Sequence, residues 1–223
     1  MKLFFGLGNP DPQYTRTRHN AGFMVVDRLI ERFAKGQTPK GSFKAIAVEA
    51  TIGQEKCLFL KPTTYMNRSG QSVGEAVNFY KVDAARDVLV ITDDIALPVG
   101  AVRLRPAGGS GGHNGLEDIR RALGGDDWPR LRLGVGAKPS FMDQADYVLS
   151  RFTSDESLPM EAAIAKSAQA CEVFAAKGLD AAMNFANAPP PDPNRPKRPR
   201  PPDLPERGSK PQGEGPPKPD SPP

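Results

Sequence analysis

A sharp change of composition near Ala188 limits the part of this 223-residue chain that can fold around a core. Of its 24 prolines, 15 lie from Pro189 onward, and Leu204 is the one large apolar residue in that segment. So few apolar side chains cannot bury a core, and we expect residues 189–223 to form a disordered, proline-rich tail. Residues 1–188 are long enough for a single domain with a substantial core.

Charge, cysteine content and apolar runs bear on the possible partners of the protein and on its compartment. The tail has seven Lys and Arg against five Asp and Glu, so it carries +2 of the total charge of +4, and the body carries the other +2. A mildly basic body is compatible with an anionic partner without requiring one. Cys57 and Cys171 lie in ordinary apolar runs, which indicates two reduced core thiols rather than a disulfide framework or a zinc site. The apolar run from Leu3 to Leu7 is too short for a signal peptide, and no run has membrane-spanning length, so we expect a cytoplasmic protein without membrane contact.

Apolar spacing predicts alternating strands and helices. Strands are expected in KLFFGL, FKAIAVEATI, KCLFLKP, DVLVITD, GAVRLRP and RLRLGVG, with the second and third paired across a Gly-Gln turn. Helical spacing is found from Asn20 to Phe33, 69–80, after the loop GGSGGHNG, near 145–151 and over about 155–177. Asn20 is expected to cap the first helix. The predicted class is α/β, a single domain with a mixed sheet flanked by helices.

The opening stretch, GLGNPDPQ, has the glycines of a dinucleotide-binding loop but not its geometry. Gly6 and Gly8 fit the first two motif positions, whereas Asp11 stands at the third. Pro10 and Pro12 forbid an early helix, so no helix N-terminus can meet a pyrophosphate at Gly8. We therefore expect this stretch to place side chains rather than to bind a nucleotide.

Polar residues follow several predicted strands. Asn9, Asn67 and Asp93 come at or beyond the carboxyl ends of three of them, where ligands bind in open α/β sheets. His19 and Asn114 lie on loops that lead into helices and could complete the same site. The local alternative stays open, since Asn beside Gly or Pro often only forms a turn. His113 is expected to be a loop residue packed for structure.

These residue types favour hydrolysis by an activated water. A neutral His19 can accept a proton, and Asp93 can hold its tautomer and stabilise the imidazolium. The amides of Asn67 and Asn114 suit a developing oxyanion. A serine nucleophile elbow is not indicated, because the two Gly-x-Ser-x-Gly matches, at 70–74 and 108–112, lie inside a predicted helix and inside a glycine-rich loop rather than at a sharp strand-to-helix turn. The scheme needs no metal and no cofactor.

Several long motifs resemble those of bacterial-type peptidyl-tRNA hydrolases. They are GLGNPDPQYTRTRHNAGF, LKPTTYMNRSGQSV, VLVITDDIALPVGAVRLRPAGGSGGHNGLEDI, RLRLGVGAKP and DYVLSRF. They stand in the family's order and spacing over nearly the whole of residues 1–188, and the tail lies outside them. The resemblance implies an enzyme, usually monomeric, that cleaves the ester between a peptide and tRNA and so recycles tRNA dropped by stalled ribosomes.

The resemblance also assigns roles to residues. It implies that His19 is the catalytic base, that Asp93 supports it, and that Asn9 distinguishes peptidyl-tRNA from unblocked aminoacyl-tRNA. Substrate contacts are implied for Tyr14, Tyr65, Asn67 and Asn114. Family members often have His where Ser110 stands and an acidic residue where Ala96 stands, which puts in doubt only local loop packing and RNA contacts.

Two points stay open in the sequence: which arginines contact tRNA, and whether the protein is catalytic. Some of the arginines in the second half of the body are candidates for tRNA phosphate contacts, or else form a solvated charged face: Arg103, Arg105, Arg120, Arg121, Arg130 and Arg132. The main alternative function is a non-catalytic RNA-binding protein on the same fold. A hydrolase of some other ester or amide is a more distant one.

Overall fold

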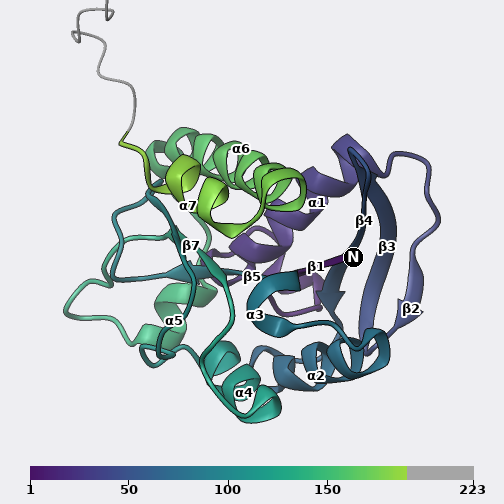
Figure 1. Ribbon diagram of the computed structural model, residues 1–223. Coiled ribbons are helices and arrows are strands. Elements are labelled where there is room, and N and C mark those ends of the chain that lie inside the picture. The colour runs from purple at the N-terminus through teal and green to yellow at the C-terminus, as the bar shows by residue number, and fades with distance from the viewer. Residues whose placement is uncertain (190–223) are drawn as a thin grey trace, which may run out of the picture. The chain divides into compact units, whose positions relative to one another are not determined.

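The computed structural model describes residues 1–189, and Met1–Ala188 form one compact unit. The predicted proline-rich tail lies outside the described residues. A seven-stranded sheet has the order β2-β3-β4-β1-β5-β7-β6 (Figure 1). Its strands are β1 Lys2–Gly6, β2 Lys40–Ser42, β3 Ala45–Ile52, β4 Glu55–Pro62, β5 Val88–Asp94, β6 Val102–Arg105 and β7 Arg130–Gly134.

The centre of the sheet is parallel and its edges are antiparallel. Strand β1 pairs in parallel with β4 and β5, and β5 pairs in parallel with β7. The β3–β4 hairpin pairs Ile52 with Glu55 across the predicted Gly-Gln turn, and β6 runs antiparallel to β7. The predicted α/β class with a mixed sheet is therefore confirmed.

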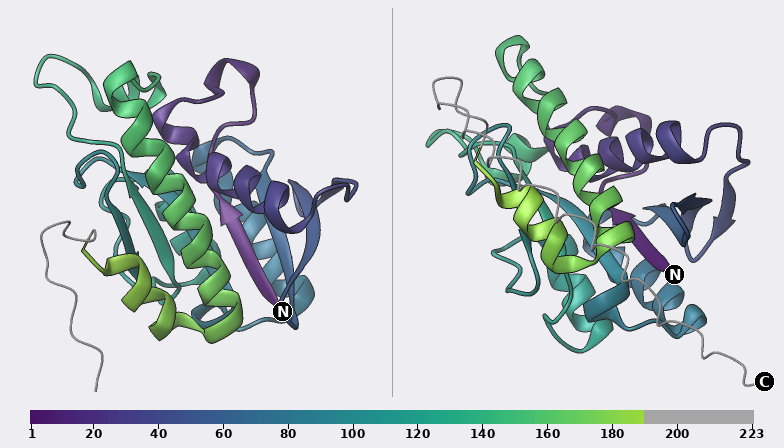
Figure 2. Two further views of the ribbon diagram at one scale, coloured as in Figure 1. Left: turned by 90° about the horizontal axis from the view of Figure 1, so that it is seen from above. Right: turned by 45° about the horizontal axis from the view of Figure 1, so that its top comes forward.

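Helices cover both faces of the sheet (Figures 1 and 2). They are α1 Ala21–Phe33, α2 Ser69–Tyr80, α3 Ala84–Asp87, α4 Asn114–Leu123, α5 Gln144–Leu149, α6 Ser154–Lys177 and α7 Leu179–Asn187. Side chains of α1, α6 and α7 share one buried cluster with Phe4, whereas α2 and α4 share another with Leu3 and Phe5. Successive side chains of β1 thus point into different clusters, so a strand buried on both faces needs an apolar residue at every position.

Most predicted helices are confirmed, with small shifts at their ends. Helix α6 begins one residue earlier than expected, because Thr153 and Glu156 form a capping box at its start. Helix α7 was not predicted. It follows Gly178, whose φ is +82°, and Asn187 at its end bonds both the N–H and the carbonyl of Leu104 on edge strand β6.

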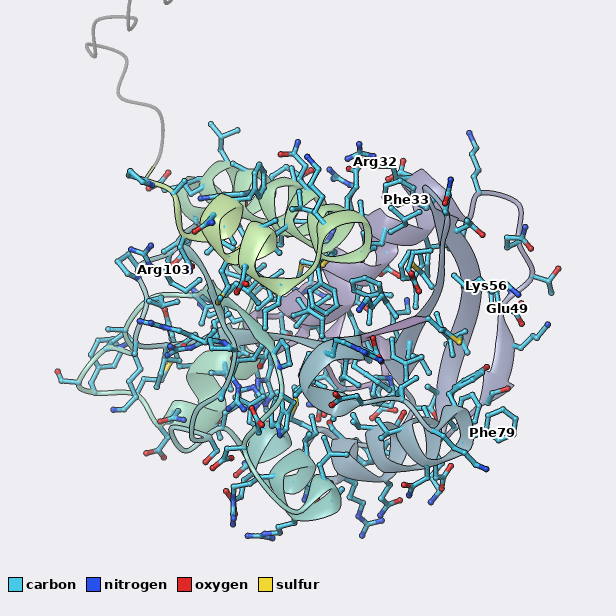
Figure 3. The ribbon with its side chains drawn as sticks, viewed as in Figure 1. Arg32, Phe33, Glu49, Lys56, Phe79 and Arg103 are labelled. Atoms are coloured by element: carbon cyan, nitrogen blue, oxygen red, sulfur yellow. The ribbon has the colours of Figure 1, made fainter. Side chains whose placement is uncertain are left out.

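Helix α1 touches the sheet backbone to backbone. A Cβ on Gly6 would lie 2.3 Å from the carbonyl oxygen of Gly22, and one on Gly22 would lie 2.3 Å from that of Ile91. Both positions therefore require glycine for close approach. At the other end of α1, Arg32 forms an ion pair of 2.8 Å with Glu172 of α6 at the surface (Figure 3).

None of the helices within residues 1–189 combines the length and the apolar character needed to cross a bilayer.

Candidate active site

A cleft of about 1220 Å³ collects most of the candidate site residues. Its wall includes Asn9, His19, Tyr65, Asn67, Asp93 and Asn114. These residues come from the segment after β1, the turn before α1, the segment after β4, the end of β5 and the start of α4. Tyr14 belongs to a short 3-10 helix, Pro12–Tyr14, and is not among the residues that line the cleft.

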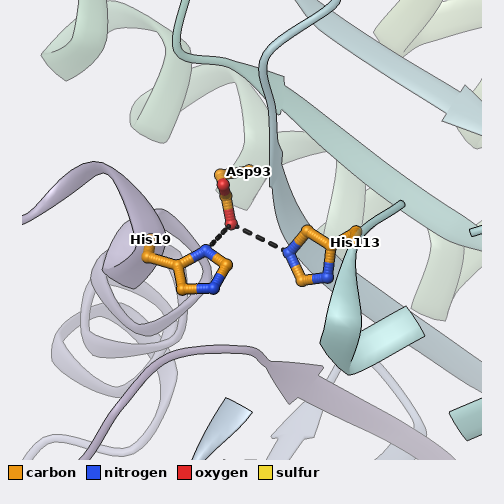
Figure 4. A group of neighbouring side chains, drawn as sticks. All are labelled: His19, Asp93 and His113. Atoms are coloured by element: carbon orange, nitrogen blue, oxygen red, sulfur yellow. Dashed lines mark hydrogen bonds and ion pairs between the residues drawn. The ribbon is translucent and has the colours of Figure 1, made fainter. Parts of the chain in front are cut away.

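His19 and Asp93 form a direct hydrogen bond (Figure 4). His19 lies in the 3-10 turn Arg18–Asn20, and its Nδ1 is 2.9 Å from Oδ1 of Asp93, whose side chain is only 2% exposed. Burial alone would raise the pKa of the Asp93 carboxyl, but His19 and His113 outweigh it and hold that pKa well below its usual range. The ionised carboxylate can only accept, so His19 donates from Nδ1, and in the neutral form of the ring the lone pair lies on Nε2.

Asn9 is held by three hydrogen bonds. Its N–H donates to Oδ1 of Asn20, its carbonyl accepts from Nδ2 of Asn20, and its own Oδ1 accepts from the backbone N–H of Met66, each at 2.9 Å. Because a backbone N–H must meet an oxygen, these contacts also orient the Asn9 amide. Its Nδ2 group is then the part that it can offer to a ligand.

The role predicted for Asn20 is wrong in its detail. Asn20 does stand immediately before α1, but its side chain makes no capping hydrogen bond to the helix. Both ends of its amide are used by the backbone of Asn9 instead. Asn20 stands at the N-cap position that its residue type favours, but its side chain bonds the backbone of Asn9 rather than that of the helix.

His113 belongs to the site, although its sequence context indicated only a structural loop residue. Its Nε2 lies 3.1 Å from Oδ1 of Asp93 and 2.8 Å from Oγ1 of Thr92. Its Nδ1 accepts the backbone N–H groups of Gly115 and Leu116 at the start of α4, at 3.1 and 3.3 Å. The one sequence signal for this was that His113 is the only histidine besides His19.

The group His19, Asp93 and His113 has the spacing of a metal site, with potential ligand atoms all within 4.8 Å of one another. Its chemistry does not fit one. A ring nitrogen that accepts two N–H groups carries a lone pair, so the proton of neutral His113 lies on Nε2, the atom that faces Asp93. A protonated nitrogen is no metal ligand.

The candidate arginines divide into different roles. Arg130 is buried, stacks over Trp128 at 3.7 Å, and donates to the carbonyls of Gly108, Gly109 and Asp126. Burial lowers its pKa to about 10. Arg130 therefore anchors the glycine-rich loop and is not free to bind phosphate, contrary to its inclusion among the candidates.

The other candidate arginines differ in whether a carboxylate pairs with them. Arg120 and Arg121 pair with Glu117 on α4, and Arg132, which lines the cleft, pairs with Asp94. Arg105 also lines the cleft, is exposed, and has no side-chain hydrogen bond or ion pair with any other residue in the described part of the chain. Ser110 and Ala96, the two departures from the family pattern, both line the same cleft.

A family model described as peptidyl-tRNA hydrolase matches residues 3–194. The chain belongs to the peptidyl-tRNA hydrolase family. It is 48% identical over 188 residues to the peptidyl-tRNA hydrolase of Rhodopirellula baltica, covering 84% of this chain and 98% of that protein. The corresponding protein of Roseiflexus sp. is 44% identical over 209 residues, covering 94% and 95%.

Solved structures of the peptidyl-tRNA hydrolase family agree in fold. The crystal structure of the enzyme from Acinetobacter baumannii has a TM-score of 0.78 and 37% identity, covering 84% of this chain and 95% of that one. These similarities confirm the expected class of enzyme, an ester hydrolase that acts on peptidyl-tRNA. They do not favour the non-catalytic alternative.

Proposed function

We propose that the cleft hydrolyses the ester between a peptide and the terminal ribose of tRNA, with His19 as general base and Asp93 as its supporting carboxylate. The hydrogen bond of 2.9 Å from His19 Nδ1 to Asp93 is the observation that carries the proposal. It leaves a basic Nε2 on a residue that lines the cleft. A base oriented by a carboxylate is the arrangement that water activation requires.

In the proposed reaction, His19 Nε2 removes a proton from water while the water oxygen attacks the ester carbonyl carbon. Asp93 stabilises the resulting imidazolium. The side-chain amides of Asn67 and Asn114, both on the cleft wall, are proposed to donate to the carbonyl oxygen as it gains negative charge. The carbon–oxygen bond to the ribose then breaks, and the imidazolium returns its proton to the ribose oxygen. No metal or cofactor is called for in this scheme.

Asn9 is proposed to select substrates whose α-amino group is blocked. Because the Met66 N–H fixes Oδ1 on the side away from the ligand, we propose that Asn9 presents its Nδ2 donors to the cleft. A donor suits the carbonyl oxygen of a peptide or N-acyl group. An unblocked ammonium would lose water molecules on entering the cleft, and the N–H donors of Asn9 cannot replace them, because the ammonium is itself a donor.

Asn9→Asp is therefore expected to narrow the preference for blocked over unblocked aminoacyl-tRNA, and Asn9→Ala to narrow it less. In the Asp variant one oxygen can still accept from Met66, while the other provides an acceptor for the ammonium. The measurement is kcat/KM for both substrates with all three proteins. Wild-type ratios in both variants would reduce Asn9 to a turn former.

Arg105 is proposed to contact a tRNA phosphate, since it is a cation on the cleft wall that has no partner among residues 1–189. Arg105→Gln is expected to weaken tRNA binding and to lower the slope of log K against log salt by about 1, the value for one lost phosphate contact. Arg103→Gln is the matched control. Arg103, labelled in Figure 3, is two residues away on β6 and is not among the residues that line the cleft. Equal slopes for the two variants would contradict this assignment.

The remaining substrate contacts are proposed for the tyrosines. Tyr65 is 52% exposed at the cleft and donates to Asp11 through its hydroxyl at 2.8 Å, which leaves the ring available to stack on a base or ribose. Tyr14 is proposed to contact a part of the substrate outside the cleft. We also propose that the protein acts as a monomer in the cytoplasm, where its substrate is produced.

The proposed function is tested with N-acetylated aminoacyl-tRNA as substrate. The expected result is release of the N-acetylated amino acid, far faster than from a small alkyl ester of the same acyl group. Similar kcat/KM values for both esters would indicate a general esterase, and no turnover of either would contradict the proposal.

A further inference from the structure

The scheme above leaves one contact of the buried carboxylate unused. Oδ1 of Asp93 meets two imidazole nitrogens, Nδ1 of His19 at 2.9 Å and Nε2 of His113 at 3.1 Å (Figure 4). Only His19 is needed as a base. The second ring must therefore be explained by what it does to Asp93.

The protonation of His113 is determined by helix α4. Its Nδ1 accepts the N–H groups of Gly115 and Leu116, two of the amides that have no partner within the helix. A proton on Nδ1 would point at these two donors and leave both N–H groups unpaired. The proton of His113 is thus confined to Nε2, the atom that faces Asp93 and Thr92.

Charge gives a second reason for a neutral His113. The ring centroids of His19 and His113 are 5.0 Å apart. In the proposed reaction, His19 becomes an imidazolium. Two cationic rings at that distance would repel each other. A neutral His113 leaves the charge of Asp93 to balance a single cation, the one formed on His19.

We propose that His113 is a positioning residue: a neutral Nε2–H donor, fixed by the first amides of α4, that holds the Asp93 carboxylate in the orientation in which it bonds His19. The glycine-rich loop and helix α4 thereby contribute to the geometry of the base. This inference rests on the proposed function, since it assigns a part in the same reaction.

The first test is spectroscopic and does not depend on activity. The untagged protein, labelled with ¹⁵N in its imidazoles, has just two histidines to resolve, and the His113→Asn variant assigns them. At neutral pH we expect His113 to carry its proton on Nε2 and none on Nδ1. A proton on Nδ1, or a mixture of the two tautomers, would overturn the proposal while leaving His19 as the base.

The second test is kinetic and uses two variants. In His113→Asn, the shorter amide can still accept from the N–H groups of α4, because Asn is a favoured N-cap, but it no longer reaches Asp93. We expect kcat to fall about tenfold, the loss produced by one hydrogen bond to a charged group, with KM and the melting temperature nearly unchanged.

Thr92→Val is the matched control, because it removes the other acceptor of His113 Nε2 with little change in shape. We expect its kcat to stay within about twofold of wild type, a change well below the contribution of one hydrogen bond. A loss as large as that of His113→Asn would show that His113 acts through Thr92 and would overturn the proposal. Wild-type kcat in His113→Asn would overturn it as well. No turnover by the wild type would instead contradict the proposed function.

Discussion

Replacing His19 by alanine is expected to lower kcat/KM for N-acetylated aminoacyl-tRNA by about 10²–10⁴-fold, the usual contribution of a general base. Fold and tRNA binding should persist, because His19 lies in a 3-10 turn and belongs to neither of the two buried apolar clusters. The measurements are single-turnover rates, the dissociation constant for uncharged tRNA and the melting temperature.

His113→Asn serves as the matched control for His19→Ala, since it removes the other ring that meets Asp93. Its smaller expected loss, about tenfold, separates the base from the residue that supports its partner. If His19→Ala kept more than half of the wild-type activity, water activation by His19 would have to be abandoned.

Asp93→Asn is expected to reduce the rate by a similar factor, on the order of 10²–10⁴, although the two side chains are nearly the same size. An amide can donate to Nδ1 of His19 and so favour the tautomer with its proton on Nε2, which removes the base. The ¹⁵N spectrum of His19 should report this change of tautomer directly. An unchanged dependence of rate on pH would show that Asp93 only shapes the turn.

The same substitution has a predicted effect on stability in acid. The pKa of Asp93 is lower in the folded protein than its ordinary value, so its ionised form stabilises the fold above about pH 4 and that stabilisation is lost as the pH falls further. Asp93→Asn removes this contribution. Its free energy of unfolding should therefore fall less than that of the wild type between neutral and acid pH, as denaturant titrations can measure.

Local pattern was sufficient for the sheet and for the longer helices. The apolar run of β1 and the helical spacing of α1 and α2 identify elements whose burial follows from periodicity alone. The apolar run DVLVITD places Asp93 at the end of β5, and the rule that ligands bind at the carboxyl ends of parallel strands makes it a candidate site residue.

Contacts between distant segments could not be predicted in this way. The capping rule placed Asn20 before α1 but could not foresee its bonds to Asn9. His113 has the same local sequence whether its ring meets Asp93 or solvent. Arg130 was counted as a surface cation, yet the carbonyls of the glycine-rich loop and the ring of Trp128 surround its guanidinium. In each case the side chain's partner lies on another element, and periodicity contains no information about it.

The glycine contact between α1 and the sheet has a consequence for how this enzyme tolerates change. At Gly6 and Gly22 no side chain separates the helix from the strands, so the spacing there is set by main-chain atoms in contact. His19 enters its turn just before this point, and Ile91 lies two residues before Asp93 on the strand that Gly22 touches. The distance between base and carboxylate is therefore insulated from the size of core side chains elsewhere. Substitutions that enlarge or shrink side chains of the apolar clusters can therefore accumulate in evolution, or be introduced by design, without a change in the distance between His19 and Asp93.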